Sequence, residues 1–125
     1  MDDPERVAKK VLGCDASIEW VSVINKKGEK LAHAKSRLFP RGPVVPDKTI
    51  GRLAALDSVT LAAFSQAEKW YGGMDYILLA HEKAQIILVR GIPGGLIIAA
   101  KTRRSDSAEY IFAKMKAALS GPGAK

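Results

Sequence analysis

Carboxylates are the first residues of this sequence to consider for chemistry, because two of them at suitable spacing can act as general acid and general base. The candidates are Asp57, Glu68, Asp75 and Glu82. No two of them have a spacing that suggests acid/base catalysis. Asp57 and Glu68 instead fall on one side of a predicted helix, where Lys48, Arg52 or a partner's basic residues can meet them. We therefore predict no catalytic residues and a protein that is not an enzyme.

Residues that bind metals or phosphates give no stronger signal. His33 has no second His, Cys or carboxylate at metal-ligand spacing, so we predict no metal site. The stretch 91–95 is rich in glycine, but it lies between two predicted strands and so lacks the helix N-terminus that phosphate sites use. Neither a G-x-x-x-x-G-K-[S/T] nor a G-x-G-x-x-G motif occurs. We predict no cofactor.

The single cysteine, Cys14, excludes an internal disulfide and fits a reducing compartment, so we expect a cytoplasmic protein. It has no His partner, which favours a buried, inert thiol over a reactive one. The acidic start of the sequence does not resemble a secretory signal, and the longest apolar stretches are too short to span a membrane.

The formal net charge of +7 and the pI near 9.7 raise the question of an anionic partner. The basic residues are spread along the chain and no aromatic residues alternate with them, so nucleic-acid binding is a less favoured alternative. The densest group is Lys101, Arg103 and Arg104. A solvated sheet edge is the favoured interpretation of this group, and an anion or partner patch is the alternative.

Three short apolar runs between Met74 and Thr102 organise the rest of the chain. They are too short for ordinary helices and rich in Ile, Leu and Val, which predicts an antiparallel meander of three strands. His81–Lys83 and Pro93–Gly95 are its predicted turns. A further hairpin is predicted over Ile18–Ala34, with its turn at Asn25–Gly28.

Helices are predicted on both sides of these strands. The first runs from Asp3 to Leu12, with Asp3 as the cap and Gly13 as the end. The last runs from Ser107 to Leu119, where Asp106 and Glu109 suggest a capping box. We expect one domain over 1–120, a basic, proline-rich connector over 35–48 that either covers the domain or contacts a partner, and a disordered tail over 121–125.

The longest helix is predicted over Thr49–Tyr71, ended by Gly72 and Gly73. Its apolar arc is wider than one sheet face requires. One side carries Ile50, Leu53, Leu61, Phe64 and Tyr71, and the adjoining side carries Leu56, Val59, Ala63, Ala67 and Trp70. A helix that is apolar on two sides is buried on two sides, so we expect another element of the chain or a partner to cover the second one.

The order helix, two strands, long helix, three strands, helix resembles that of the roadblock/dynein light chain family. The likeness rests on the hairpin V-I-N-K-K-G-E-K-L-A, on the long helix leading into Met74–Leu79, and on Ile86–Ala99 followed by a helix. The chain also resembles small archaeal proteins with the same hairpin and meander. It departs from the family in its longer, basic insert at Phe39–Asp47 and in the turn Arg103–Ser107, where many members carry an Asn-containing motif.

The resemblance implies an α+β, profilin-like fold, with a five-stranded antiparallel sheet flanked by helices. It also implies a dimer through the long helix and the neighbouring strand, and a non-catalytic scaffold or regulator of a small Ras-like GTPase. The expected partners are a second copy or a paralogue, and a GTPase. The expected interface is Leu56, Val59, Ala63, Ala67, Trp70, Tyr76 and Leu78. The alternative function is a small-ligand sensor of related shape.

Overall fold

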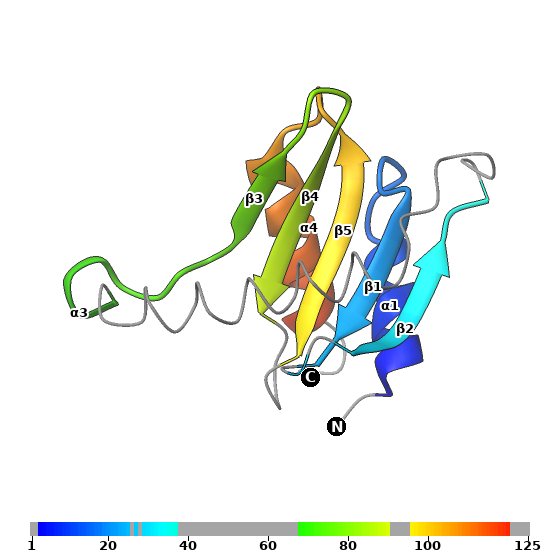
Figure 1. Cartoon of the computed structure of the whole chain (residues 1–125), viewed down its shortest axis with the longest axis horizontal. Coiled ribbons are helices and arrows are strands. Elements are labelled where there is room, and N and C mark those ends of the chain that lie inside the picture. Colours follow the sequence, from blue (N-terminus) through cyan, green and yellow to red (C-terminus); the bar gives the residue numbers. More distant parts are fainter. Residues whose placement is uncertain (1–2, 26, 28, 38–67, 91–95, 121–125) are drawn as a thin grey trace.

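The structure is a computed structural model of the whole chain and describes residues 3–25, 27, 29–37, 68–90 and 96–120. The strands are β1 (Trp20–Ile24), β2 (Lys30–Lys35), β3 (Ile77–Ala80), β4 (Ala84–Arg90) and β5 (Ile97–Arg103). The helices are α1 (Pro4–Leu12), α3 (Glu68–Tyr71) and α4 (Ala108–Ser120). Figure 1 shows the strands as one twisted sheet, with α1 and α4 together on one of its faces.

All pairings in the sheet are antiparallel, and the strand order is β2-β1-β5-β4-β3. The first hairpin joins the meander through β1 and β5, where Val21 pairs with Ala100 and Val23 with Ile98. β2 and β3 are therefore the two edges of the sheet. The predicted α+β fold with a five-stranded antiparallel sheet is confirmed.

Alternation along the strands sends side chains to opposite faces, and both faces are apolar. On the helix-covered face, Val21, Ile87 and Ile98 pack with Val11 of α1 and Met115 of α4. The opposite face carries a second buried cluster of Trp20, Ile24, Ile86, Leu88, Ile97 and Ala99. β1 is buried along its whole length because it contributes to both clusters. A central strand buried on both sides requires the nearly unbroken apolar run that the sequence shows.

Two helix starts differ in detail from the predictions. Asp3 is at the N-cap position of α1, but its side chain makes no capping hydrogen bond. At α4 the predicted cap, Asp106, is wrong: Ser107 Oγ accepts the hydrogen bond from the Tyr110 N–H at 3.2 Å. The reason is that Asp106 is already engaged by Arg103, whose backbone N–H donates to Asp106 Oδ2 at 3.1 Å.

The hairpin turn follows from one side chain. Asn25 Oδ1 accepts hydrogen bonds from the backbone N–H groups of Lys27 and Glu29, both at 2.9 Å. This side-chain turn is what Asn favours between strands, and it confirms the predicted hairpin. The His81–Lys83 turn is also confirmed, since the His81 N–H donates to the carbonyl oxygen of Ala84 at 2.8 Å.

Several predictions lie outside the described residues. These are most of the connector over 35–48, the helix of Thr49–Tyr71 before Glu68, the Pro93–Gly95 turn and the tail. The extent of the domain also stays a prediction. The end of the long helix is confirmed, since α3 ends at Tyr71. In the part of the chain that the structure describes, no helix is long and apolar enough to cross a membrane.

Candidate functional site

Helix α3 exposes two aromatic side chains. Trp70 is 81% exposed and Tyr71 is 87% exposed. Figure 1 shows α3 at one end of the molecule, joined to β3 by an extended stretch of chain. Gly72 makes this arrangement, because its φ of 84° turns the chain out of the helix while its N–H still donates to the Glu68 carbonyl oxygen at 2.9 Å. An exposed Trp–Tyr pair is typical of a surface that binds another protein.

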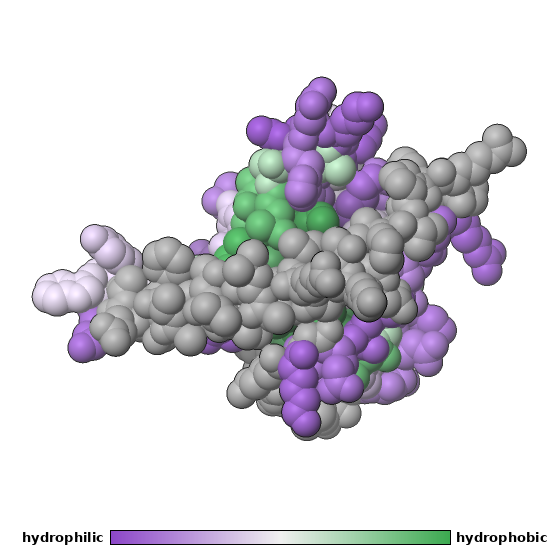
Figure 2. All heavy atoms as spheres, viewed as in Figure 1, coloured by the Kyte–Doolittle hydropathy of each residue, from purple (hydrophilic) through white to green (hydrophobic). Residues whose placement is uncertain are grey.

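The strand that follows, β3, is an open edge of the sheet. It pairs with β4 on one side, and it has no strand on its other side among the described residues. Ile77 and Leu79 pack against the second buried cluster, while Leu78 stays 39% exposed. Figure 2 shows hydrophobic side chains gathered over this part of the sheet. An edge strand of this kind offers unpaired backbone groups to a partner strand.

Two contacts hold the stretch between α3 and β3 against the body of the domain. The Tyr76 hydroxyl donates to Glu109 Oε1 at 2.8 Å, and its ring lies 4.9 Å from that of Phe112. The hydrogen bond to Glu109 raises the pKa of Tyr76, because deprotonation would place two negative charges together. An ion pair of 3.8 Å between Arg90 and Glu68 adds a weaker, partly exposed contact.

A groove of about 610 Å³ lies where this stretch meets the ends of β4 and α4. Met74, Val89, Phe112 and Leu119 give it an apolar lining, and Lys116 is at its border. This volume lies within the range of small-molecule sites. The groove, the exposed pair of α3 and the open edge of β3 together make up the candidate functional site, which we call the α3–β3 surface.

The predicted interface residues are only partly within the described chain. Trp70 and Leu78 lie on the α3–β3 surface and are exposed, whereas Tyr76 directs its ring to α4. Leu56, Val59, Ala63 and Ala67 lie outside the described residues. Sequence reasoning missed Tyr71 as an exposed residue, because a continuous helical pattern assigned it to the buried side of the long helix. The Gly72–Gly73 pair beside it was the available signal.

The predicted basic patch is largely engaged within the chain. Lys101 Nζ lies 2.6 Å from Glu19 Oε1, and both side chains are largely buried. Arg103 forms a 3.3 Å ion pair with Asp106. Arg104 is exposed. Glu68, for which the sequence suggested Arg52 or Lys48, is paired with Arg90. The three predicted cations therefore do not form a single anion site.

Cys14, Ser22 and His33 carry groups that could act as nucleophiles or metal ligands. Burial, reinforced by the nearby Asp15 carboxylate, raises the pKa of the Cys14 thiol to about 11, which fits the inert cysteine of the prediction. Ser22 is fully buried, and its Oγ lies 2.7 Å from His33 Nδ1. Within the described ranges, no group of three His, Cys, Asp or Glu residues could hold a metal ion.

Comparison with known proteins identifies the fold. Neither a protein-family model nor a curated protein matches the chain. Among solved structures, the gliding protein MglB from Thermus thermophilus is 18% identical, with a TM-score of 0.66 over 95% of this chain and 87% of that one. A roadblock/LC7 domain from Streptomyces avermitilis is 12% identical, with a TM-score of 0.65 over 94% and 92%. Profilin II from Acanthamoeba castellanii is 12% identical, with a TM-score of 0.57 over 93% of both chains. The chain therefore has the fold that roadblock/LC7 domains share with profilins.

Proposed function

We propose that this chain is a non-catalytic, dimeric scaffold or regulatory module of roadblock type, acting on a small Ras-like GTPase or within a protein complex. The observation that carries the proposal is the exposed Trp70–Tyr71 pair of α3 together with the open edge strand β3 that follows it in the chain. The GTPase enters through the roadblock resemblance. The partner in the dimer is a second copy of the chain or a paralogue.

Side-chain chemistry supports self-association at the α3–β3 surface. Trp and Tyr are the residues that most often carry the binding energy of an interface, because they bury a large area with few rotatable bonds. Two antiparallel β3 edges can also extend one sheet into the next through backbone hydrogen bonds. MglB, which has the same fold, has been solved in a tetrameric arrangement. The predicted residues Leu56, Val59, Ala63 and Ala67 belong to the same proposed interface.

The test of self-association is the solution mass by light scattering behind a sizing column. At tens of micromolar protein we expect a dimer, and we expect Trp70→Glu and Tyr71→Glu to be monomers, because an unpaired charge in an apolar interface is costly. Tyr110→Glu is the matched control, since Tyr110 is also an exposed tyrosine but lies on α4. A wild-type monomer, or a Tyr110→Glu variant as dissociated as Tyr71→Glu, would contradict the proposed interface.

The GTPase step has its own test. The wild-type chain and its monomeric variant would be used to capture small GTPases loaded with GDP or with a GTP analogue. We expect capture by the dimer, with a preference for one nucleotide state. If the chain is shown to be dimeric and the same amount of GTPase is recovered with and without it, the GTPase is not its partner. The proposal would then be reduced to a scaffold within a protein complex.

The groove of the α3–β3 surface favours one alternative, a small-ligand sensor. Its apolar lining suits a small molecule with an apolar body, and its charged lining residues are of both signs: Glu68, Asp75, Arg90 and Lys116. A panel of small metabolites in a thermal-shift assay tests it, because a ligand that binds the folded state raises the melting temperature. If no compound raises the melting temperature, this alternative is excluded.

A further inference from the structure

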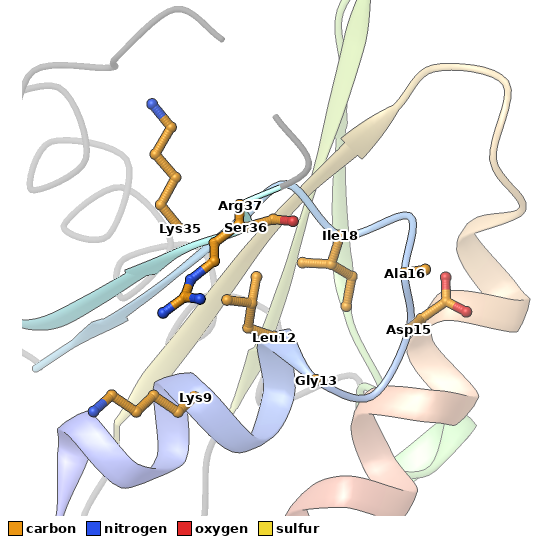
Figure 3. A pocket seen from close by; sticks show the side chains of 9 residues that line it. All are labelled: Lys9, Leu12, Gly13, Asp15, Ala16, Ile18, Lys35, Ser36 and Arg37. Atoms are coloured by element: carbon orange, nitrogen blue, oxygen red, sulfur yellow. The ribbon is translucent and has the colours of Figure 1, made fainter. Parts of the chain in front are cut away.

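A second hollow, of about 480 Å³, lies beside β2, at the edge of the sheet opposite β3. It is bordered by the last turns of α1, by the loop that leads to β1, and by the residues at the end of β2. Leu12 and Ile18 form its apolar part. Figure 3 shows these two side chains in the middle of the hollow, with charged side chains around them.

The border of this hollow is mainly cationic. Lys9, Lys35 and Arg37 line it, against a single carboxylate, Asp15. Figure 3 shows the Lys9 and Arg37 side chains extended to the same side of Leu12, away from Asp15. Asp15 Oδ2 also accepts hydrogen bonds from the Ser17 N–H at 3.2 Å and from the Ser17 hydroxyl. Because Asp15 lies on the other side of Leu12, the part of the hollow near Lys9 and Arg37 is positive.

The end of α1 does not account for this charge. A cation in the last turn of a helix offsets the negative end of the dipole, which is a sufficient reason for Lys9 alone. Two of the last carbonyl oxygens of α1 are already satisfied, since the Gly13 N–H donates to the Lys9 carbonyl oxygen and the Cys14 N–H donates to that of Val11, each at 3.0 Å. Arg37 comes from a different part of the chain, beyond β2. Lys9 and Arg37 therefore come together at the hollow from two parts of the chain, whereas the Lys35 side chain extends away from Lys9 (Figure 3).

We propose that this hollow binds an acidic segment of a protein partner, with carboxylates near Lys9 and Arg37 and an aliphatic side chain against Leu12. The Arg37 guanidinium can hold a carboxylate through two hydrogen bonds. The volume exceeds what a lone inorganic anion fills, and the apolar centre between charged borders suits a peptide that alternates the two kinds of side chain. None of the lining residues is aromatic, so the hollow lacks the stacking surface of a single-strand nucleic-acid site.

The position of the hollow suits a partner different from the proposed second copy. It lies beside β2, and the strand order places β2 and β3 at opposite edges of the sheet. A dimer joined through β3 would carry one such hollow at each outer end. The inference does not require the dimer, because all the residues that line the hollow belong to one chain.

The test is fluorescence anisotropy with a labelled peptide that alternates glutamate and leucine. We expect binding at low salt that weakens as salt is added, and no binding of the same peptide with glutamine in place of glutamate. Reversing both charges in Lys9→Glu/Arg37→Glu should weaken binding by about tenfold or more, since two favourable pairs become repulsive. Both side chains are exposed, and circular dichroism checks that the fold is kept.

The matched control is Lys83→Glu/Arg104→Glu, which changes the net charge equally at exposed positions away from the hollow. We expect less than a twofold effect from it. An equal loss in both variants would overturn the proposal, because net charge alone would then explain the binding. Absence of peptide binding at low salt would overturn it as well. A short single-stranded oligodeoxythymidylate that binds more tightly than the peptide, and loses binding in Lys9→Glu/Arg37→Glu, would assign the hollow to nucleic acid instead.

Discussion

Lys101 provides the sharpest test of how the basic residues are used, because the sequence alone made it a candidate for an anion patch. In the structure its ammonium is paired with the Glu19 carboxylate at 2.6 Å, and the two side chains keep only 15% and 10% of their exposure. Lys101→Met removes the cation and leaves a largely buried carboxylate without its partner. We therefore expect Lys101→Met to lower the free energy of unfolding, whatever the chain binds.

The magnitude follows from the burial of the pair. Removing one partner of a buried ion pair costs about 3 to 5 kcal/mol. The residual exposure of both side chains places this pair at the lower end, at about 3 kcal/mol. Replacing both partners with apolar groups removes the stranded charge, so Glu19→Met/Lys101→Met should cost less than Lys101→Met alone.

Urea unfolding followed by far-UV circular dichroism measures these differences. With a slope of about 2 kcal/mol per molar, a loss of 3 kcal/mol lowers the urea midpoint by about 1.5 M. All variants are compared at one protein concentration, because dimerisation makes the midpoint concentration-dependent. Arg104→Met is the control, an exposed cation whose loss should stay within about 0.5 kcal/mol. A Lys101→Met variant as stable as Arg104→Met, or a double variant whose cost is the sum of the two single variants, would refute the structural role of the pair.

Three further predictions concern local features. Ser107→Ala should destabilise the domain by about 1 kcal/mol in thermal unfolding, because Ser107 caps α4; an unchanged melting temperature would contradict this cap. Gly72→Ala should weaken dimerisation by a free energy of about 1 kcal/mol in a dilution series, since alanine is strained at a φ of 84°, while Gly73→Ala, with no atom near its added Cβ, should not. The pKa of the Cys14 thiol is raised from 9.0 to about 11 in the folded chain, so the stability contributed by the neutral thiol is fully present below pH 9.0 and is lost as pH rises toward 11. The unfolding midpoint of the wild type should therefore fall over that pH range, and that of Cys14→Ala should fall less.

Much of the fold could be predicted from short stretches of sequence. Three runs are long enough and apolar enough to be central strands, and all three are central strands in the sheet: Trp20–Ile24, Ala84–Arg90 and Ile97–Arg103. Asn25 predicted a turn because its side chain bonds the backbone two and four residues on. Gly72 predicted a helix end because only glycine accepts the turned-out backbone without strain. In each case the determining interaction lies within a few residues, so local chemistry is sufficient.

The candidate sites depend instead on residues that only folding brings together. Glu19 and Lys101 are 82 residues apart in the chain, and Tyr76 and Glu109 are 33 apart, so no spacing rule connects either pair. The same holds for the hollow that joins Lys9 to Arg37, and for the exposure of Tyr71, which helical periodicity assigned to a buried side. The sequence by itself determined the strands and the turns at Asn25 and at His81–Lys83. The tertiary structure decided which charges are neutralised and which remain at a surface, because pairing and burial depend on long-range packing and not on local propensity.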